Sequence, residues 1–208
     1  FTPPRTIYLD VAFQDTLDPR DVRSGVGEIL KVHAIDGPDS FAALAADYDR
    51  LFSEPGLMLR YVRRALEIKK AYIEDDEFDR GPRNIFNYGH TFGHAIEAAT
   101  DFAIPHGIAV TIGMDMANFV SSRIGDGTED HFRRLHPTLA SNYDGFESHP
   151  VPFDRFLAAI LKDKKNTGTG SVTMILPGAD GRLAKVTHAA DDGFTSACNT
   201  FLDEVRSQ

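Results

Sequence analysis

The sequence predicts a mainly α-helical domain of many helices with a few short strands. Apolar residues recur at helical spacing in about nine segments, several of which begin with a capping residue or a proline. Strand-like runs of β-branched residues are short and occur in about three places. Strands and helices do not alternate, and no Gly-rich phosphate loop is present, so we do not expect a nucleotide-binding βαβ unit within residues 1–208.

The composition of the 208 residues is globular, with 42% hydrophobic and 25% charged side chains, which excludes a disordered chain. The formal net charge of −9 argues against a protein that binds nucleic acid by neutralising phosphates. The sequence offers neither a run of about 20 apolar residues for a membrane span nor a secretory signal. Cys198 is the single cysteine, which excludes an intrachain disulfide and fits a cytoplasmic location.

The N-terminal part of the sequence begins with Phe1 rather than Met and leads into a short strand, Thr6 to Leu9, so we expect the chain to start within a longer protein. A capping Asp followed by proline predicts a helix from Pro19 to about His33. After a Gly-Pro turn and short helical pieces, a long amphipathic helix is expected from Leu57 to about Asp75.

The central part of the sequence predicts two helices that are apolar on most sides and should therefore be buried. The first runs from Asn84 to about Thr100, and the second follows Pro105 and includes Ile108 to Val120. The remaining expected elements are helices at about Glu129 to Ala140, Phe153 to Lys162 and Asp191 to Val205, and a hairpin of the strands Ser171 to Pro177 and Leu183 to Val186.

A pair of histidines, His90 and His94, is the first candidate for chemistry, because residues four apart share one face of a helix. Gly89 and Gly93 precede them, and each should cost about 1 kcal/mol relative to Ala in a helix interior. Small residues there allow a backbone, a metal or a ligand to approach closely. Core or surface histidines without a ligand remain the alternative, because the Glu of the zinc-protease motif is replaced by Thr91.

A third histidine, His106, precedes the second buried helix, where a helix N-terminus favours the neutral imidazole that binds metals. A catalytic zinc site usually has three protein ligands, often two His and one Glu. Glu28 is the candidate carboxylate, because Glu28 and Lys31 lie on an otherwise apolar helical segment. An ordinary surface ion pair between them is the alternative.

Further basic residues could form a local anion site in this acidic chain. They are Lys69, Lys70, Arg83, Lys162 and Lys165. For Lys70, Lys162 and Lys165, a solvated helix face is the simpler interpretation.

Several motifs follow one another in an order that resembles the C-terminal half of 3-dehydroquinate synthase and its sugar phosphate cyclase relatives. They are Glu28-x-x-Lys31, Asn87-Tyr-Gly-His90-Thr-Phe-Gly-His94-Ala-Ile-Glu97, His106-Gly-x-Ala-Val110 and Asp163-Lys164-Lys165. The resemblance covers nearly the whole chain. It implies that residues 1–208 form a single helical metal- and substrate-binding domain, and that the N-terminal NAD-binding domain of the family is absent from this chain.

The resemblance also implies residue roles. Glu28, His90 and His106 would bind a metal, usually Zn²⁺ or another divalent ion such as Co²⁺. The implied catalytic residues near the metal are Lys31, Lys69 and His94, and those that hold the anionic groups of the substrate are Arg83, Asn87 and Lys164. The residues implied to touch NAD⁺ are Phe13, Gln14, Asp15 and Thr16.

The activity implied by the resemblance is that of an NAD-dependent carbon–oxygen lyase. It would convert 3-deoxy-arabino-heptulosonate 7-phosphate to 3-dehydroquinate with release of phosphate, a step of the shikimate pathway of aromatic amino acid biosynthesis. The resemblance further implies a homodimer. Because the NAD-binding domain is expected to be missing, we predict that the chain alone does not turn over.

One position departs from the family pattern, since Ile108 stands where 3-dehydroquinate synthases commonly have Glu. This leaves other sugar phosphate cyclases, of the 2-epi-5-epi-valiolone or 2-deoxy-scyllo-inosose synthase type, as a first alternative. A metal-dependent polyol dehydrogenase domain is a second alternative, disfavoured by the matches at Asn87 and Lys164. A helical domain without catalytic function is a third, but it gives Gly89 and Gly93 no purpose.

Overall fold

The computed structural model describes residues 5–76, 81–162 and 170–207 and confirms a mainly helical fold. The helices are α1 (Pro19–Asp36), α2 (Pro38–Asp47), α3 (Pro55–Asp75), α4 (His90–Ala99), α5 (His106–Ile124), α6 (Glu129–Tyr143), α7 (Phe153–Lys162) and α8 (Asp192–Thr200). Short 3₁₀ helices span Val11–Thr16, Tyr48–Phe52 and Pro82–Asn87, and a π-helical turn, Phe201–Val205, follows α8. The strands β1 (Ser171–Pro177) and β2 (Leu183–Ala189) pair antiparallel, with Met174 opposite Val186.

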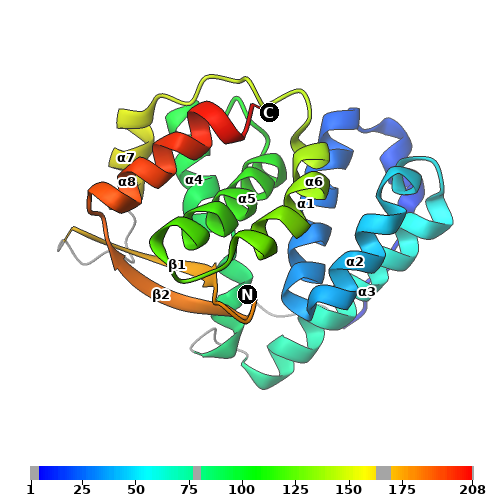
Figure 1. Ribbon diagram of the computed structural model, residues 1–208. Coiled ribbons are helices and arrows are strands. Elements are labelled where there is room, and N and C mark those ends of the chain that lie inside the picture. The colour runs from blue at the N-terminus through cyan, green and yellow to red at the C-terminus, as the bar shows by residue number, and fades with distance from the viewer. Residues whose placement is uncertain (1–4, 77–80, 163–169, 208) are drawn as a thin grey trace.

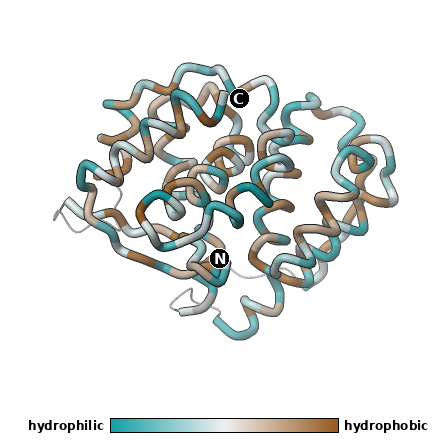
Figure 2. The backbone as a smooth tube through the Cα atoms, viewed as in Figure 1, coloured by the Kyte–Doolittle hydropathy of each residue, from teal (hydrophilic) through white to brown (hydrophobic). Residues whose placement is uncertain are grey.

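Helix α5 is the centre of the molecule. All its residues from Gly107 to Ser121 are buried, and it packs against α1, α4, α6 and α8 (Figure 1). Helices α2 and α3 lie on one side of it, and α7, α8 and the hairpin lie on the other (Figure 1). Hydrophobic positions accordingly gather along the central helices, while the outer turns are more hydrophilic (Figure 2). The expectation of two buried central helices is confirmed.

Glycines allow α5 to approach its two neighbours at backbone distance. A Cβ atom on Gly107 would overlap the carbonyl of Ser24 in α1, and one on Gly27 would overlap the carbonyl of Gly107. On the other side of α5, a Cβ on Gly113 would overlap the carbonyl of Gly89. Gly93 is also close to α5, although less tightly, since a Cβ there would be 3.0 Å from the Ala109 carbonyl oxygen. The close approach predicted for Gly89 and Gly93 is therefore confirmed, and the backbone that approaches is α5.

Two of the expected elements differ in the structure. The segment expected as a helix from Asn84 to Thr100 is interrupted at Gly89, whose φ of +75° is left-handed, so Gly89 precedes α4 instead of lying within it. The expected strand Thr6 to Leu9 is not formed, and this segment has no regular secondary structure. Its side chains are exposed, with Tyr8 91% accessible, and the sheet of the described residues consists of β1 and β2 alone.

The other boundaries differ by a few residues. Helix α1 continues three residues past His33, β2 continues to Ala189, and the expected closing helix ends in the π turn. Among the described residues, no helix is both long and apolar enough to span a membrane.

Candidate metal centre

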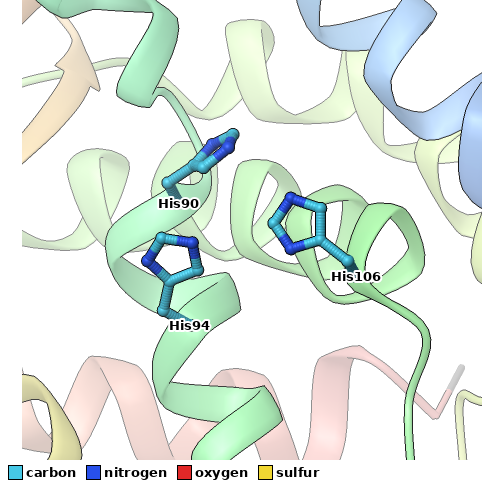
Figure 3. A group of neighbouring side chains, drawn as sticks. All are labelled: His90, His94 and His106. Carbon is cyan, nitrogen blue, oxygen red and sulfur yellow. The ribbon is translucent and has the colours of Figure 1, made fainter. Parts of the chain in front are cut away.

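Three histidines converge where α4 and α5 begin. His90 is the first residue of α4, His94 follows one turn later, and His106 is the first residue of α5. The side chains face one another, with one ligand nitrogen of each within 4.8 Å of the others (Figure 3). The ring centroids of His90 and His106 are 5.4 Å apart. The structure thus unites the predicted histidine pair with the third histidine.

Glu28 of α1 completes the group. Its Oε1 lies 3.7 Å from His90 Nε2 and 3.8 Å from His106 Nε2. This Oε1 is buried and has no hydrogen-bond partner. A buried carboxylate oxygen without a partner is costly, and a divalent cation between it and the two imidazoles would satisfy it. One carboxylate and two imidazoles are a common ligand set for catalytic zinc, so the residues fit the metal that the sequence predicts.

Two acceptors hold the histidines in the orientation that metal binding needs. His90 Nδ1 lies 3.2 Å from the Tyr88 carbonyl oxygen, and His106 Nδ1 lies 3.2 Å from both carboxylate oxygens of Glu97. Because a carbonyl or an ionised carboxylate only accepts, each Nδ1 donates and each Nε2 keeps its lone pair toward Glu28. A carboxylate behind a ligating histidine also increases the basicity of that ligand.

Two lysines balance the charge of Glu28. Lys31 Nζ lies 2.9 Å from Glu28 Oε2 and 3.5 Å from His90 Nε2, and Lys69 Nζ lies 3.8 Å from Glu28 Oε2. Burial is the largest influence and by itself would raise the pKa of Glu28. The ion pair with Lys31 and the charges of His90 and Lys69 together outweigh burial, so the pKa lies below the ordinary value. Burial, and then the charge of Lys31, lower the pKa of His90 to about 4. The carboxylate is therefore ionised and His90 neutral near pH 7, as metal ligands must be.

Lys70, the neighbour of Lys69, instead pairs with Glu74 on the same helix, and the catalytic role of Lys69 stays a prediction. A cavity of about 600 Å³ opens beside His94, between α4 and α7. Its lining includes Lys162 and Arg155, and Arg155 is paired with the Asp101 carboxylate.

The contacts described for the remaining predicted site residues are not with Glu28 or the three histidines. Arg83 N donates to the Asp76 carboxylate, and Asn87 Nδ2 donates to the Asn84 carbonyl. Lys164 lies outside the described residues. Phe13, Gln14, Asp15 and Thr16 belong to the 3₁₀ helix Val11–Thr16, which packs on α3 and has no buried residue. Their predicted roles stay predictions.

Sequence reasoning did not assign a role to Glu97, Gly27 or Gly107. Glu97 lies seven residues after His90 in α4, and this spacing along one helical face is a signal that could have suggested it. The two glycines had no such signal, because their role depends on where α1 and α5 cross. Ser24 adds a contact at this crossing, where its Oγ accepts from the Gly107 amide at 2.9 Å.

Comparisons with a family model and with individual known sequences indicate the same family. A family model described as 3-dehydroquinate synthase C-terminal matches residues 25–166. The chain is 34% identical to the 3-dehydroquinate synthase of Sinorhizobium medicae, over 98% of the chain and 54% of that relative. It is 36% identical to that of an Exiguobacterium species, over 85% of the chain and 49% of the relative. The chain thus spans about half the length of the curated relatives it matches.

Solved structures show the same fold. The 2-epi-5-epi-valiolone synthase of Streptomyces hygroscopicus, with NAD⁺ and Zn²⁺ bound, superposes with a TM-score of 0.77 at 27% identity, over 92% of this chain and 54% of that one. A 2-deoxy-scyllo-inosose synthase complexed with carbaglucose-6-phosphate, NAD⁺ and Co²⁺ superposes with a TM-score of 0.76 over all of this chain and 57% of that one. At 21% identity, the second likeness concerns the fold alone.

Proposed function

Because this chain belongs to the 3-dehydroquinate synthase family, we propose that it is the metal- and substrate-binding part of an NAD-dependent carbon–oxygen lyase. The proposed reaction converts 3-deoxy-arabino-heptulosonate 7-phosphate to 3-dehydroquinate with release of phosphate. The observation that carries the metal site is Glu28 Oε1, which is buried without a partner and faces the Nε2 atoms of His90 and His106.

In this proposal Glu28, His90 and His106 hold a zinc ion, or another divalent metal such as Co²⁺. When bound, the metal supplies Lewis acidity toward substrate hydroxyl oxygens, and NAD⁺ supplies a hydride acceptor. Lys31 lies within reach of both Glu28 and His90, so its ammonium can donate to an oxygen of a substrate at the metal.

Other residues of the chain bind and orient the substrate. Lys69 and His94 border the same space, so both can contact a substrate at the metal. Arg83, Asn87 and Lys164 would hold its anionic groups, the phosphate above all. Fixed cations of this kind restrict the substrate to a reactive orientation.

NAD⁺ would be bound mainly by an N-terminal domain that is absent from this chain, with Phe13 to Thr16 touching it. The unmatched half of the curated relatives leaves room for such a domain. Large apolar side chains are also exposed between residues 7 and 13, with Tyr8 91% and Phe13 77% accessible, as expected of a surface that another part of the protein covers. A cytoplasmic homodimer is part of the same proposal.

A second candidate function is that of a related cyclase, which would use the same metal ligands on sedoheptulose 7-phosphate. Two observations support it. The chain superposes on 2-epi-5-epi-valiolone synthase, and Ile108 follows His106-Gly107 where 3-dehydroquinate synthases commonly have Glu.

The test of the metal site is metal analysis of the chain beside a Glu28→Ala, His90→Ala, His106→Ala triple variant. We expect about one zinc per chain in the wild type, the stoichiometry of a mononuclear site, and none in the variant. Equal metal content in both would refute the ligand assignment.

The test of the activity is phosphate release by the full-length protein with NAD⁺ and each of the two heptulose phosphates. Faster release from 3-deoxy-arabino-heptulosonate 7-phosphate is expected, whereas a preference for sedoheptulose 7-phosphate would support the second candidate. The chain alone, without its N-terminal half, should release none.

A further inference from the structure

The turn that joins α4 to α5 connects two residues of the proposed metal centre. Glu97 lies in the last turn of α4, and His106 begins α5 directly after the connection. The Glu97 carboxylate contacts His106 Nδ1, although the two residues are nine positions apart in the chain. This contact therefore depends on the path of the backbone between them. A different path would separate His106 from its acceptor and change the direction of its ring.

The backbone of this turn is strained. The Phe102 amide donates to the Glu97 carbonyl at 2.8 Å, which is the bond that closes a Schellman helix end. Glycine usually occupies the left-handed position of such an end, but here Asp101 has a φ of +52° and Phe102 follows with +61°. Phe102 is 74% exposed, so burial of its ring does not hold this conformation. Two consecutive left-handed residues with side chains are unfavourable and need support from the surrounding structure.

Arg155 of α7 supplies this support. Its Nη1 and Nη2 donate to the two carboxylate oxygens of Asp101, and Nη2 also donates to the Ala98 carbonyl at 3.2 Å. Ala98 belongs to the last turn of α4, where carbonyls lack partners within the helix. The guanidinium thus joins the end of α4 to the left-handed residue that follows it. Glycine at position 101 would fit the backbone but could not form this bidentate pair, which has a more defined geometry than most exposed ion pairs.

The contacts of Arg155 indicate how it can affect the metal centre. Among the described residues, its hydrogen bonds and ion pair are with Ala98 and Asp101, and none is with Glu28 or a histidine. Any effect of Arg155 on the ligands must therefore pass through the turn or through its charge. The two routes differ in sign, because a positive charge repels a metal cation whereas a fixed ligand favours its binding.

We propose that Arg155 is a positioning residue of the metal centre. By holding Asp101, it fixes the turn between Glu97 and His106 and keeps the His106 ring directed at the other two ligands. This inference rests on the proposed function, since it takes His106 as a metal ligand. It gives the pair of Arg155 and Asp101 a role beyond that of a surface ion pair.

The test is the zinc affinity of Arg155→Gln, measured by competition with a chromogenic chelator. We expect zinc to bind about tenfold more weakly than to the wild-type chain, at the lower end of the effect of residues behind a ligand. Loss of a positive charge would by itself strengthen the binding of a cation, so weaker binding identifies positioning as the cause. The visible spectrum of the Co²⁺ form should also shift, because the orientation of His106 changes.

Arg50→Gln is the matched control. Arg50 forms an exposed bidentate pair with Glu54, which follows α2 in a different part of the chain. This variant should therefore bind zinc like the wild type.

Two substitutions of Asp101 separate the backbone from the charge. Asp101→Gly and Asp101→Ala remove the same carboxylate and the same contact with Arg155. Glycine adopts the left-handed conformation without strain, so Asp101→Gly should stay within about threefold of the wild-type zinc affinity. Asp101→Ala should bind about tenfold more weakly, because alanine neither tolerates this conformation nor pairs with Arg155. Arg155→Gln should have no further effect in the Asp101→Gly background.

Two results would overturn this inference and leave the proposed function intact. The first is that Arg155→Gln has the zinc affinity and Co²⁺ spectrum of the wild type, even if its stability in urea is lower, since the pair would then be structural only. The second is that Asp101→Gly and Asp101→Ala lose zinc affinity equally, since charge would then explain both losses. A wild-type chain that binds no zinc would refute the metal centre itself, and this inference with it.

Discussion

Glu28 and Asp115 are both carboxylates that lie beside histidines in the helical core. They differ in whether these histidines form hydrogen bonds to them. Asp115 Oδ2 accepts from His136 Nδ1 at 2.8 Å and from the Tyr143 hydroxyl at 2.7 Å. The two histidines beside Glu28 Oε1 are 3.7 and 3.8 Å away, beyond hydrogen-bond distance. Each carboxylate keeps one buried oxygen without a partner, so the contrast lies in the histidines, which are bonded in one cluster and held apart in the other.

The pKa values of the two carboxyl groups also shift in opposite directions. Burial raises the pKa of Asp115, although the hydrogen bond from His136 opposes this, whereas the pair with Lys31 holds the pKa of Glu28 below its usual value. Asp115 is fully buried among groups that bond to it, which stabilises the packing of α5 against α6. Glu28 is ionised, with cations nearby and space between it and two imidazoles. Glu28 Oε1 and the two Nε2 atoms that face it thus leave room for a metal ion between them, whereas the direct bond between Asp115 and His136 leaves none.

The largest expected effect is on zinc affinity. Glu28→Gln replaces an anionic ligand by a neutral amide, and we expect zinc to bind about 1,000-fold more weakly, since binding free energies above 10 kcal/mol are shared among few ligands. Competition with a chromogenic chelator measures this. Asp115→Asn is the comparison variant and should bind zinc like the wild type. Equal zinc affinity in the wild type and Glu28→Gln would show that Glu28, like Asp115, is not a zinc ligand.

The next effect is on folding. Asp115→Ala leaves the Tyr143 hydroxyl and the His136 N–H without an acceptor, and should lower the free energy of unfolding by about 3 kcal/mol. Urea denaturation of the metal-free chain measures it. In the same experiment Glu28→Gln should lower the free energy of unfolding by only about 1 kcal/mol, because the Gln side-chain oxygen can still accept from the buried Lys31 ammonium. Similar losses in both variants would mean that Glu28 is also structural.

A smaller effect on zinc affinity is expected from Glu97, the carboxylate that contacts His106 Nδ1. Glu97→Gln keeps the shape of the side chain but removes its charge, and zinc affinity should fall by about 10- to 100-fold. Glu129→Gln on α6 is a suitable control, because Glu129 forms only a surface pair with Arg133. The visible spectrum of the Co²⁺ form should also shift in Glu97→Gln, and an unchanged spectrum and affinity would show that Glu97 does not position His106.

The smallest effect concerns pH. The hydrogen bond to Asp115 raises the pKa of His136 above its ordinary value in the folded chain. Stability from a histidine with a raised pKa is complete below the unfolded pKa of about 6.5 and is lost as pH rises through the folded value. The wild type should therefore exceed His136→Gln in stability by about 1 kcal/mol more at pH 5.5 than at pH 9. A difference that grows with pH would contradict the assigned charge states.

Local sequence patterns predicted the helices better than the connections. Helix α7 and strand β1 have the expected bounds, since an amphipathic repeat and a β-branched run are complete within their own residues. The break at Gly89 was missed because the apolar pattern continues across it, and only the contact with α5 requires the left-handed turn. The expected strand Thr6 to Leu9 was wrong for the described residues, because a strand needs a partner that its own sequence does not provide.

By itself, the sequence determined the helical character of the chain and placed His90 and His94 on one helical face, because residue spacing fixes which side chains share such a face. The same spacing left Glu28 with two interpretations, a metal ligand or half of an ion pair with Lys31. Glu28 does form this ion pair, and its role as a metal ligand stays a prediction. Only the tertiary structure also brings an unpartnered oxygen of Glu28 to His90 and His106, because Gly27 and Gly107 let α1 and α5 touch. Contacts between residues so distant in the chain depend on how helices cross, and no local pattern encodes that.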